Sequence, residues 1–464
     1  MILSLVAPLL LAPFAAAAPQ IFATASGPDS LAPTTASTVS PQPSQTASDC
    51  VNCVTVTPSN SWATEAATSQ LSAALASAST YSSAWWTPGS YVPVPTGSAL
   101  YAPQVSAPGP NACNNSGAEF PAPPPPPGGL NTNSTPPIYH PYSDVHGFDW
   151  QSMNLALNQE WIELDLFHHG LAMFSDEEFE AAGLNAADRY LLEFMADQEV
   201  GHATLLSNIL GPRAAKQCVY RYPFHTVEEF IDFSQRLTKW GESGVYGFLE
   251  HLESRAAAQL LLQSITTEAR QQMIFRQFEG LFPMPFYFTT GIPQSWAWTL
   301  LQPYIVECPL ENPHIDFAIH PTLNVLNNPN ATLFGGNASV STNTTALSYP
   351  GREVVFSWDA PGKVAGYNQS QELYHTTGNA TCPPRFAAWV SQLNTTYTPL
   401  YDVNMTSLTA RTRQPGGYVF PNTTDAIVNG SVFVVLTDSD PYVTPHNLTM
   451  IDPHVVAGPA MYEA

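Results

Sequence analysis

The sequence has few basic residues and few charges of either sign. Lys and Arg together number 14 against 37 Asp and Glu, which gives a net charge of −23, and charged residues make up only 11% of the chain. A surface this negative repels phosphate backbones and anionic lipid headgroups. We therefore expect neither nucleic acid nor an anionic membrane as a partner.

Long apolar runs are also missing. The longest lies at the start, where residues 2–12 are almost all apolar and small residues follow at 15–18. This pattern is typical of a signal peptide, although its first residues lack Lys and Arg. The run is too short to cross roughly 30 Å of hydrocarbon. We predict that residues 1–17 are a signal peptide, that no segment spans a membrane, and that the mature chain is secreted, either extracellular or in the cell wall.

Residues 18–138 lack the apolar periodicity that a folded core needs. They are rich in Ala, Ser, Thr and Pro, and they end in a proline run at 121–129. Such a composition cannot bury enough apolar surface to offset the entropy of ordering. We predict a disordered low-complexity stalk.

Cysteine is scarce but even in number. In an oxidising compartment we expect the cysteines to form disulfides, although their spacing does not decide the pairs. Cys50 and Cys53 lie in Ser/Thr/Pro-rich sequence with no βαβ pattern, which favours a structural disulfide over a redox motif. The six are Cys50, Cys53, Cys113, Cys218, Cys308 and Cys382.

Residues 321–464 contain short β-rich runs broken by Gly, Pro and Asn. The runs at 354–358 and 432–436 are bounded by turn residues and predict strands. We expect a small β-sandwich-like domain here. Ten Asn-x-Ser/Thr sequons in this part of a secreted chain predict a glycan-coated surface. They are Asn330, Asn337, Asn343, Asn368, Asn379, Asn394, Asn404, Asn422, Asn429 and Asn447.

Residues 139–320 have helical periodicity and predict a four-helix bundle, so the fold class is α+β multidomain. One helix is expected over about 152–174, and the second opens after Asn185. The third begins at Thr226, with Glu229 completing a capping box, and the fourth follows Ser254.

Each predicted helix places a glutamate in its apolar stripe. These are Glu160, Glu199 with His202 one turn later, Glu242 and Glu268. The assignment of Glu242 to an apolar stripe is less clear, because the third predicted helix has a second apolar face. Buried carboxylates need a proton, a hydrogen bond or a cation.

Two-metal helical bundles take a Glu from each of two helices and Glu-x-x-His from each of the other two. This chain supplies one complete Glu-x-x-His, at 199–202, and has Gln271 where the second histidine would stand. A neutral amide is a poor substitute for imidazole, which argues against oxygen chemistry at a full di-iron centre. The candidate metal ligands are Glu160, Glu199, His202, Glu242 and Glu268, with Glu163 and Gln271 as a second tier.

Four segments carry a resemblance to a known family: residues 154–160, 197–202, 240–248 and 267–276. In these segments the chain resembles the ferritin-like domain of desiccation- and stress-related proteins, and especially the secreted fungal stress-response proteins of the Rds type. The resemblance implies a ferritin-like fold and a link to stress, nutrient limitation or development. It implies no particular reaction.

Two functions of different classes follow from these observations. In the first, which we favour slightly, the protein is a glycosylated surface or cell-wall component made under stress. Its carboxylate site is degenerate and holds no metal, and its partner is cell-wall polysaccharide or a second copy of itself. In the second, the helices bind iron or manganese and the protein oxidises Fe(II) or consumes peroxide. The sequence leaves open whether the protein is an enzyme.

Overall fold

Four long helices form where the periodicity predicts them. A computed structural model of the chain describes residues 144–331, 337–367, 374–378 and 383–464. The helices are α2 (Phe148–Met173), α4 (Ala186–Leu210), α5 (Val227–Leu249) and α6 (Arg255–Phe278). The predicted signal peptide, the stalk, four of the cysteines and the sequons at Asn368 and Asn379 lie outside the described residues.

Polar side chains begin three of these helices, as the sequence predicts. Asn185 accepts hydrogen bonds from the backbone at the start of α4, and Ser254 accepts one from Ala257 at the start of α6. Thr226 begins α5, but the predicted capping box is wrong. The Glu229 carboxylate accepts from the backbone N–H of His225, one residue before the N-cap.

Helix α2 begins about four residues earlier than predicted. The two carboxylate oxygens of Asp149 accept hydrogen bonds from the backbone N–H groups of Glu253 and Ser254, both at 2.9 Å. Trp150 is completely buried in the same turn. These contacts fix the first turn of α2 against the start of α6, and they depend on residues far along the chain.

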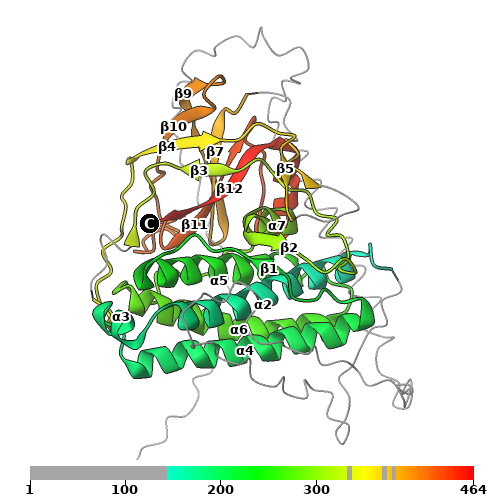
Figure 1. The fold of residues 1–464 in the computed structure, drawn as a ribbon. Helices are drawn as coiled ribbons and strands as arrows, with labels where there is room; N and C mark the ends of the chain where they lie inside the picture. Colours follow the sequence, from blue (N-terminus) through cyan, green and yellow to red (C-terminus); the bar gives the residue numbers. More distant parts are fainter. Residues whose placement is uncertain (1–143, 332–336, 368–373, 379–382) are drawn as a thin grey trace, which may run out of the picture. The chain divides into compact units, whose positions relative to one another are not determined.

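The four helices lie side by side, as Figure 1 shows, with α2 against α4 and α5, and α6 against α5 and α4. Close approach depends on glycine at one crossing: a Cβ at Gly170 would lie 2.2 Å from the Phe230 ring. The sequence did not predict two shorter helices, α3 (Asp176–Ala181) and α7 (Gln294–Leu301). Among the described residues, no helix is both long and apolar enough to cross a membrane.

The rest of the chain is rich in antiparallel strands. The strands predicted at 354–358 and 432–436 are confirmed as β4 (Glu353–Trp358) and β11 (Ser431–Thr437). One four-stranded sheet has the order β3-β4-β10-β9, with β3 (Leu323–Val325), β9 (Tyr401–Asn404) and β10 (Thr409–Arg413). The other has the order β12-β11-β7-β8, with β7 (Phe386–Ser391), β8 (Asn394–Pro399) and β12 (Val455–Glu463).

Two short strand pairs complete the sheets. Strand β5 (Val364–Ala365) pairs with β6 (Tyr374–His375), and β1 (Val219–Tyr220) pairs with β2 (Ile305–Glu307). A disulfide between Cys218 and Cys308 lies beside the second pair. It therefore joins the segment after α4 to the segment after α7, and the expectation of disulfides is met for these two cysteines.

Strand β11 connects the helical and strand-rich parts, because it is buried on both faces. Val432 and Val434 belong to a hydrophobic cluster that both four-stranded sheets share, whereas Phe433 and Val435 belong to the cluster of the helices. Gln235 of α5 also donates a hydrogen bond to Ser431 Oγ at 3.0 Å. The two parts thus share a core, and the predicted boundary between residues 320 and 321 stays a prediction.

The eight described sequons differ in exposure. Asn330, Asn429 and Asn447 are half-buried, and Asn429 Nδ2 donates to the carbonyl oxygen of Pro285. The five that are exposed are Asn337, Asn343, Asn394, Asn404 and Asn422. Glycosylation stays a prediction.

Candidate metal centre

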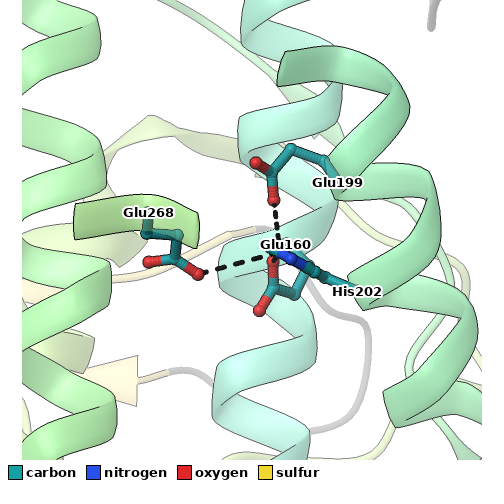
Figure 2. A group of neighbouring side chains, drawn as sticks. All are labelled: Glu160, Glu199, His202 and Glu268. Carbon is teal, nitrogen blue, oxygen red and sulfur yellow. Dashed lines mark hydrogen bonds and ion pairs between the residues drawn. The ribbon is translucent and has the colours of Figure 1, made fainter. Parts of the chain in front are cut away.

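Four of the five predicted ligands meet in the helical core (Figure 2). Glu160 comes from α2, Glu199 and His202 from α4, and Glu268 from α6. One ligand atom from each residue lies within 4.8 Å of those of the other three. All four side chains are buried, and none is more than 8% exposed. Atoms this close to one another could serve as ligands of a single ion.

The His202 ring lies at the centre of this group. Its Nδ1 is 3.0 Å from Glu199 Oε2, 3.2 Å from Glu160 Oε2 and 3.9 Å from Glu268 Oε1. Figure 2 shows the carboxylates gathered around the imidazole. Three oxygens that carry lone pairs therefore face one ring nitrogen.

The other ring nitrogen is fixed by Thr267. The Thr267 hydroxyl donates to the carbonyl oxygen of Ser264 at 2.7 Å, so at 3.0 Å it must accept from His202 Nε2–H. With the proton on Nε2, a neutral ring would turn the Nδ1 lone pair toward carboxylate oxygens, which is repulsive. A proton shared between Nδ1 and a facing carboxylate, or a metal cation, is therefore required there.

Gln271 contacts the same group. Its Nε2 donates to Glu199 Oε1 at 2.6 Å and to Gln198 Oε1 at 3.2 Å. Its Oε1 is buried without a hydrogen-bond partner among the described residues, and so is Glu268 Oε2. Buried acceptors without partners are costly. A cation near Glu268 would compensate its buried carboxylate, and three carboxylates with one imidazole are residues that fit a divalent metal.

Burial and mutual repulsion change the acidities of the group. Burial raises the pKa of Glu160 to about 7, against the opposing effect of His202, and it raises the pKa of Glu268 well above its ordinary value with the help of neighbouring glutamates. Burial alone would raise the pKa of Glu199, but His202 holds it below the ordinary value. Burial opposes protonation of His202, yet Glu199 and Glu160 raise its pKa well above the ordinary value. Without a metal, protons would have to stabilise the cluster.

Glu242 is the predicted ligand that the structure does not bring into the group. It is buried, but Lys239 Nζ contacts its Oε2 at 3.1 Å and Thr289 Oγ1 donates to its Oε1 at 3.3 Å. The competing apolar face of α5 explains why periodicity could not place this side chain.

Glu163, from the second tier, is fully buried one turn from Glu160. It accepts hydrogen bonds from Gln159 Nε2 at 2.7 Å and from Thr238 Oγ1 at 3.3 Å. Gly241 leaves room for the Gln159 amide, because a Cβ there would lie 2.6 Å from Nε2. Burial and the charges of neighbouring glutamates raise the pKa of Glu163 well above its ordinary value. Neutral donors thus bind both of its oxygens.

Sequence reasoning missed two residues beside the site, Thr267 and Lys239. Each had a signal: Thr267 directly precedes Glu268, and Lys239 lies three residues before Glu242, the spacing of an ion pair on a helix. A cleft of about 820 Å³ lies elsewhere. Its walls come mainly from the segment after α6 and from residues 337–347, and it includes none of the four clustered ligands.

Thr267→Val is expected to weaken binding of Mn(II) about tenfold, because it removes the hydroxyl that fixes the His202 tautomer. Titration of metal-free protein with Mn(II) measures the effect. Thr266→Val is the matched control, since the Thr266 side chain is exposed and its hydroxyl donates only to the carbonyl oxygen of Gln263. Equal losses in the two variants would show that Thr267 does not position the histidine.

The helices and their buried carboxylate–histidine group are features of ferritin-like proteins, and residues 148–281 match the ferritin-like domain family. Protein rds1 of Schizosaccharomyces pombe is 51% identical over 352 residues, which cover 73% of this chain and 85% of that protein. The chain therefore belongs to the rds1 family of fungal ferritin-like proteins. The resemblance noted in the sequence is confirmed.

Proposed function

We propose that this protein is a secreted, glycosylated ferritin-like stress protein whose core binds a divalent cation, iron or manganese. Four ligand atoms within 4.8 Å of one another, from three helices, carry this proposal. The buried Glu268 carboxylate, whose Oε2 has no hydrogen-bond partner among the described residues, supports it, because a cation would compensate its charge. The helices are proposed to form a four-helix bundle, and the two four-stranded sheets a β-sandwich.

The chemistry of the donors favours iron or manganese over a softer metal. Three carboxylates and one imidazole are hard or intermediate ligands, and no thiolate of a described residue takes part. Bound iron or manganese would supply one-electron redox chemistry. The chain would hold the ion with Glu160, Glu199, His202 and Glu268, while Thr267 fixes the histidine tautomer and the surrounding helices exclude water.

Secretion and a surface or wall location rest on the amino-terminal sequence and the sequons. The association with stress rests on the family resemblance. Polysaccharide or a second copy of the chain remains the proposed partner. The acidic composition agrees with the expectation that nucleic acid is not a partner.

The second candidate function is a metal-free scaffold, and the position of His202 favours it. An imidazolium between Glu160 and Glu199 would satisfy both carboxylates without any ion. Arg270, two residues after Glu268, is exposed and forms no ion pair among the described residues. A proton at Nδ1 thus replaces the metal in this alternative.

Metal analysis of the purified secreted protein decides between the two. The metal-binding proposal predicts iron or manganese that survives dialysis, and a melting temperature that falls when a chelator removes it. Re-addition of Mn(II) or Fe(II) should restore the melting temperature. Purified protein that holds no metal, takes up none on titration and melts identically with and without chelator would establish the scaffold.

A further inference from the structure

A buried lysine lies beside the candidate centre without being a ligand. Lys239 of α5 is only 1% exposed, although lysine is almost never fully buried unless it is paired. Its Nζ lies 3.1 Å from Glu242 Oε2 and 4.5 Å from the centroid of the Phe286 ring. An anion and an aromatic face thus replace the water that this ammonium loses on burial.

Glu242 is occupied on both oxygens as a result. Lys239 contacts Oε2, and Thr289, from the segment between α6 and α7, donates to Oε1 at 3.3 Å. Glu242 is not among the four residues whose ligand atoms lie within 4.8 Å of one another. The carboxylate that α5 would contribute to a two-metal site is therefore already bound to a cation that belongs to the chain itself.

This ion pair lies close to the centre. Thr238, the residue before Lys239 on α5, donates to Glu163 Oε2 at 3.3 Å, and Glu163 lies one turn from the clustered Glu160 on α2. Lys239 and Glu242 thus occupy the side of the site that faces α5.

Glu163, the other buried glutamate beside the centre, does not make up a second ligand set. Glu163 accepts from Gln159 and from Thr238, both of which are neutral donors. Within residues 144–464 as described, Glu160, Glu199, His202 and Glu268 form the only group of three or more candidate ligands. A second divalent ion would need Glu242 or Glu163 to abandon these partners.

We infer that the ammonium of Lys239 takes the place of a second metal ion, so that the core holds one divalent cation rather than two. The inference rests on the proposed metal-binding function and specifies its stoichiometry. It follows that the protein lacks a pair of adjacent metal ions for reactions that need two. Lys239 is a specificity-determining residue in this sense, since it sets how many ions the four helices accept.

The test counts the ions. Metal-free wild type, Lys239→Met and the double variant Lys239→Met/Glu242→Gln are loaded with Mn(II), desalted and analysed for manganese per chain. Wild type should hold about one ion, and Lys239→Met about two, because the substitution releases the Glu242 carboxylate. The double variant should return to about one, since an amide leaves no free charge to bind the second ion. Low-temperature electron paramagnetic resonance provides an independent signature: isolated Mn(II) in wild type and a coupled pair in Lys239→Met.

Each outcome bears on a different claim. Two ions in wild type, or a folded Lys239→Met that holds one ion with the spectrum of wild type, would overturn the role of Lys239. If Lys239→Met does not fold, the number of ions in wild type is the test: about one ion agrees with the proposal, and two ions overturn it. No ion in wild type would refute the proposed function, and binding that appears only in Lys239→Met would still support replacement of a cation by the lysine. No ion in any variant would overturn both.

Discussion

His202→Ala is expected to lower the affinity of the core for Mn(II) or Fe(II) by more than about a hundredfold. Loss of a residue that only orients a metal ligand typically costs 10–100-fold, and His202 is itself the nitrogen ligand at the centre of the group. Titration of metal-free protein measures the affinity, and the melting temperature of the metal-loaded form should fall with it, because binding to the folded state alone adds stability.

Truncation of a buried histidine would destabilise a metal-free scaffold as well, so a second substitution is needed. Gln271→His restores the second Glu-x-x-His motif, one turn after Glu268, and should raise the affinity for iron or manganese. A metal affinity that falls in His202→Ala and rises in Gln271→His would identify position 202 and position 271 as places where a side chain binds the metal. Metal that binds stoichiometrically and is indifferent to both substitutions would place the ion elsewhere in the chain.

Much of the helical part could be predicted because its determinants are local. Asn185, Thr226 and Ser254 begin helices for a reason confined to one turn, namely that their side chains bond otherwise unpaired backbone N–H groups. The pair Glu199 and His202 is likewise set by spacing on a single helix. The same locality explains the confirmed strands β4 and β11, which are apolar runs between turn residues.

Helix α2 shows where periodicity stops being informative. Almost every residue from Asp149 to Ala172 is buried, because α2 packs against α4, α5 and α7. A helix buried on all sides has no wet face from which to measure an inward direction. The sequence could therefore place Glu160 and Glu163 in the core, but it could not decide which of them faces His202.

The position of Glu242 depends on residues far away in the chain. Thr289 and Phe286 reach it and Lys239 from the segment that follows α6. Nothing in the spacing of α5 predicts contacts with an irregular segment more than forty residues later. The early start of α2, set by Asp149 and the backbone at Glu253 and Ser254, has the same non-local origin.

The metal-free protein is expected to lose stability as the pH rises from 5 to 8. The folded chain holds a proton on Glu160 up to a pKa of about 7, whereas the unfolded chain releases it near the ordinary value of 4.5. Between these values the folded state binds more protons than the unfolded state, so the free energy of unfolding falls as the pH rises. This difference between the folded and unfolded pKa of Glu160 corresponds to a loss in the free energy of unfolding on the order of 3 kcal/mol.

The other members of the cluster act in the same direction over this range. The pKa of Glu268 is raised well above its ordinary value, and that of His202 is raised too, so both also stabilise the fold through protons that are lost as the pH rises. Glu199 has a lowered pKa, and its stabilising contribution is already complete above about pH 5. A divalent ion replaces these protons, so metal binding should strengthen as the pH rises. The free energy of unfolding of the metal-bound protein should therefore depend less on pH than that of the metal-free protein.

Denaturant unfolding at pH 5 and pH 8, with chelator and with saturating Mn(II), measures both effects. Glu160→Gln is the control, because the amide keeps the shape of the side chain and cannot ionise. It should reduce the loss of stability between the two pH values in metal-free protein and also weaken Mn(II) binding. If metal-free Glu160→Gln lost as much stability between pH 5 and pH 8 as wild type does, acidic residues other than Glu160 would cause the loss. Metal-free wild type that is equally stable at both pH values would mean that the cluster releases no protons in this range, and the ion would then have no protons to replace.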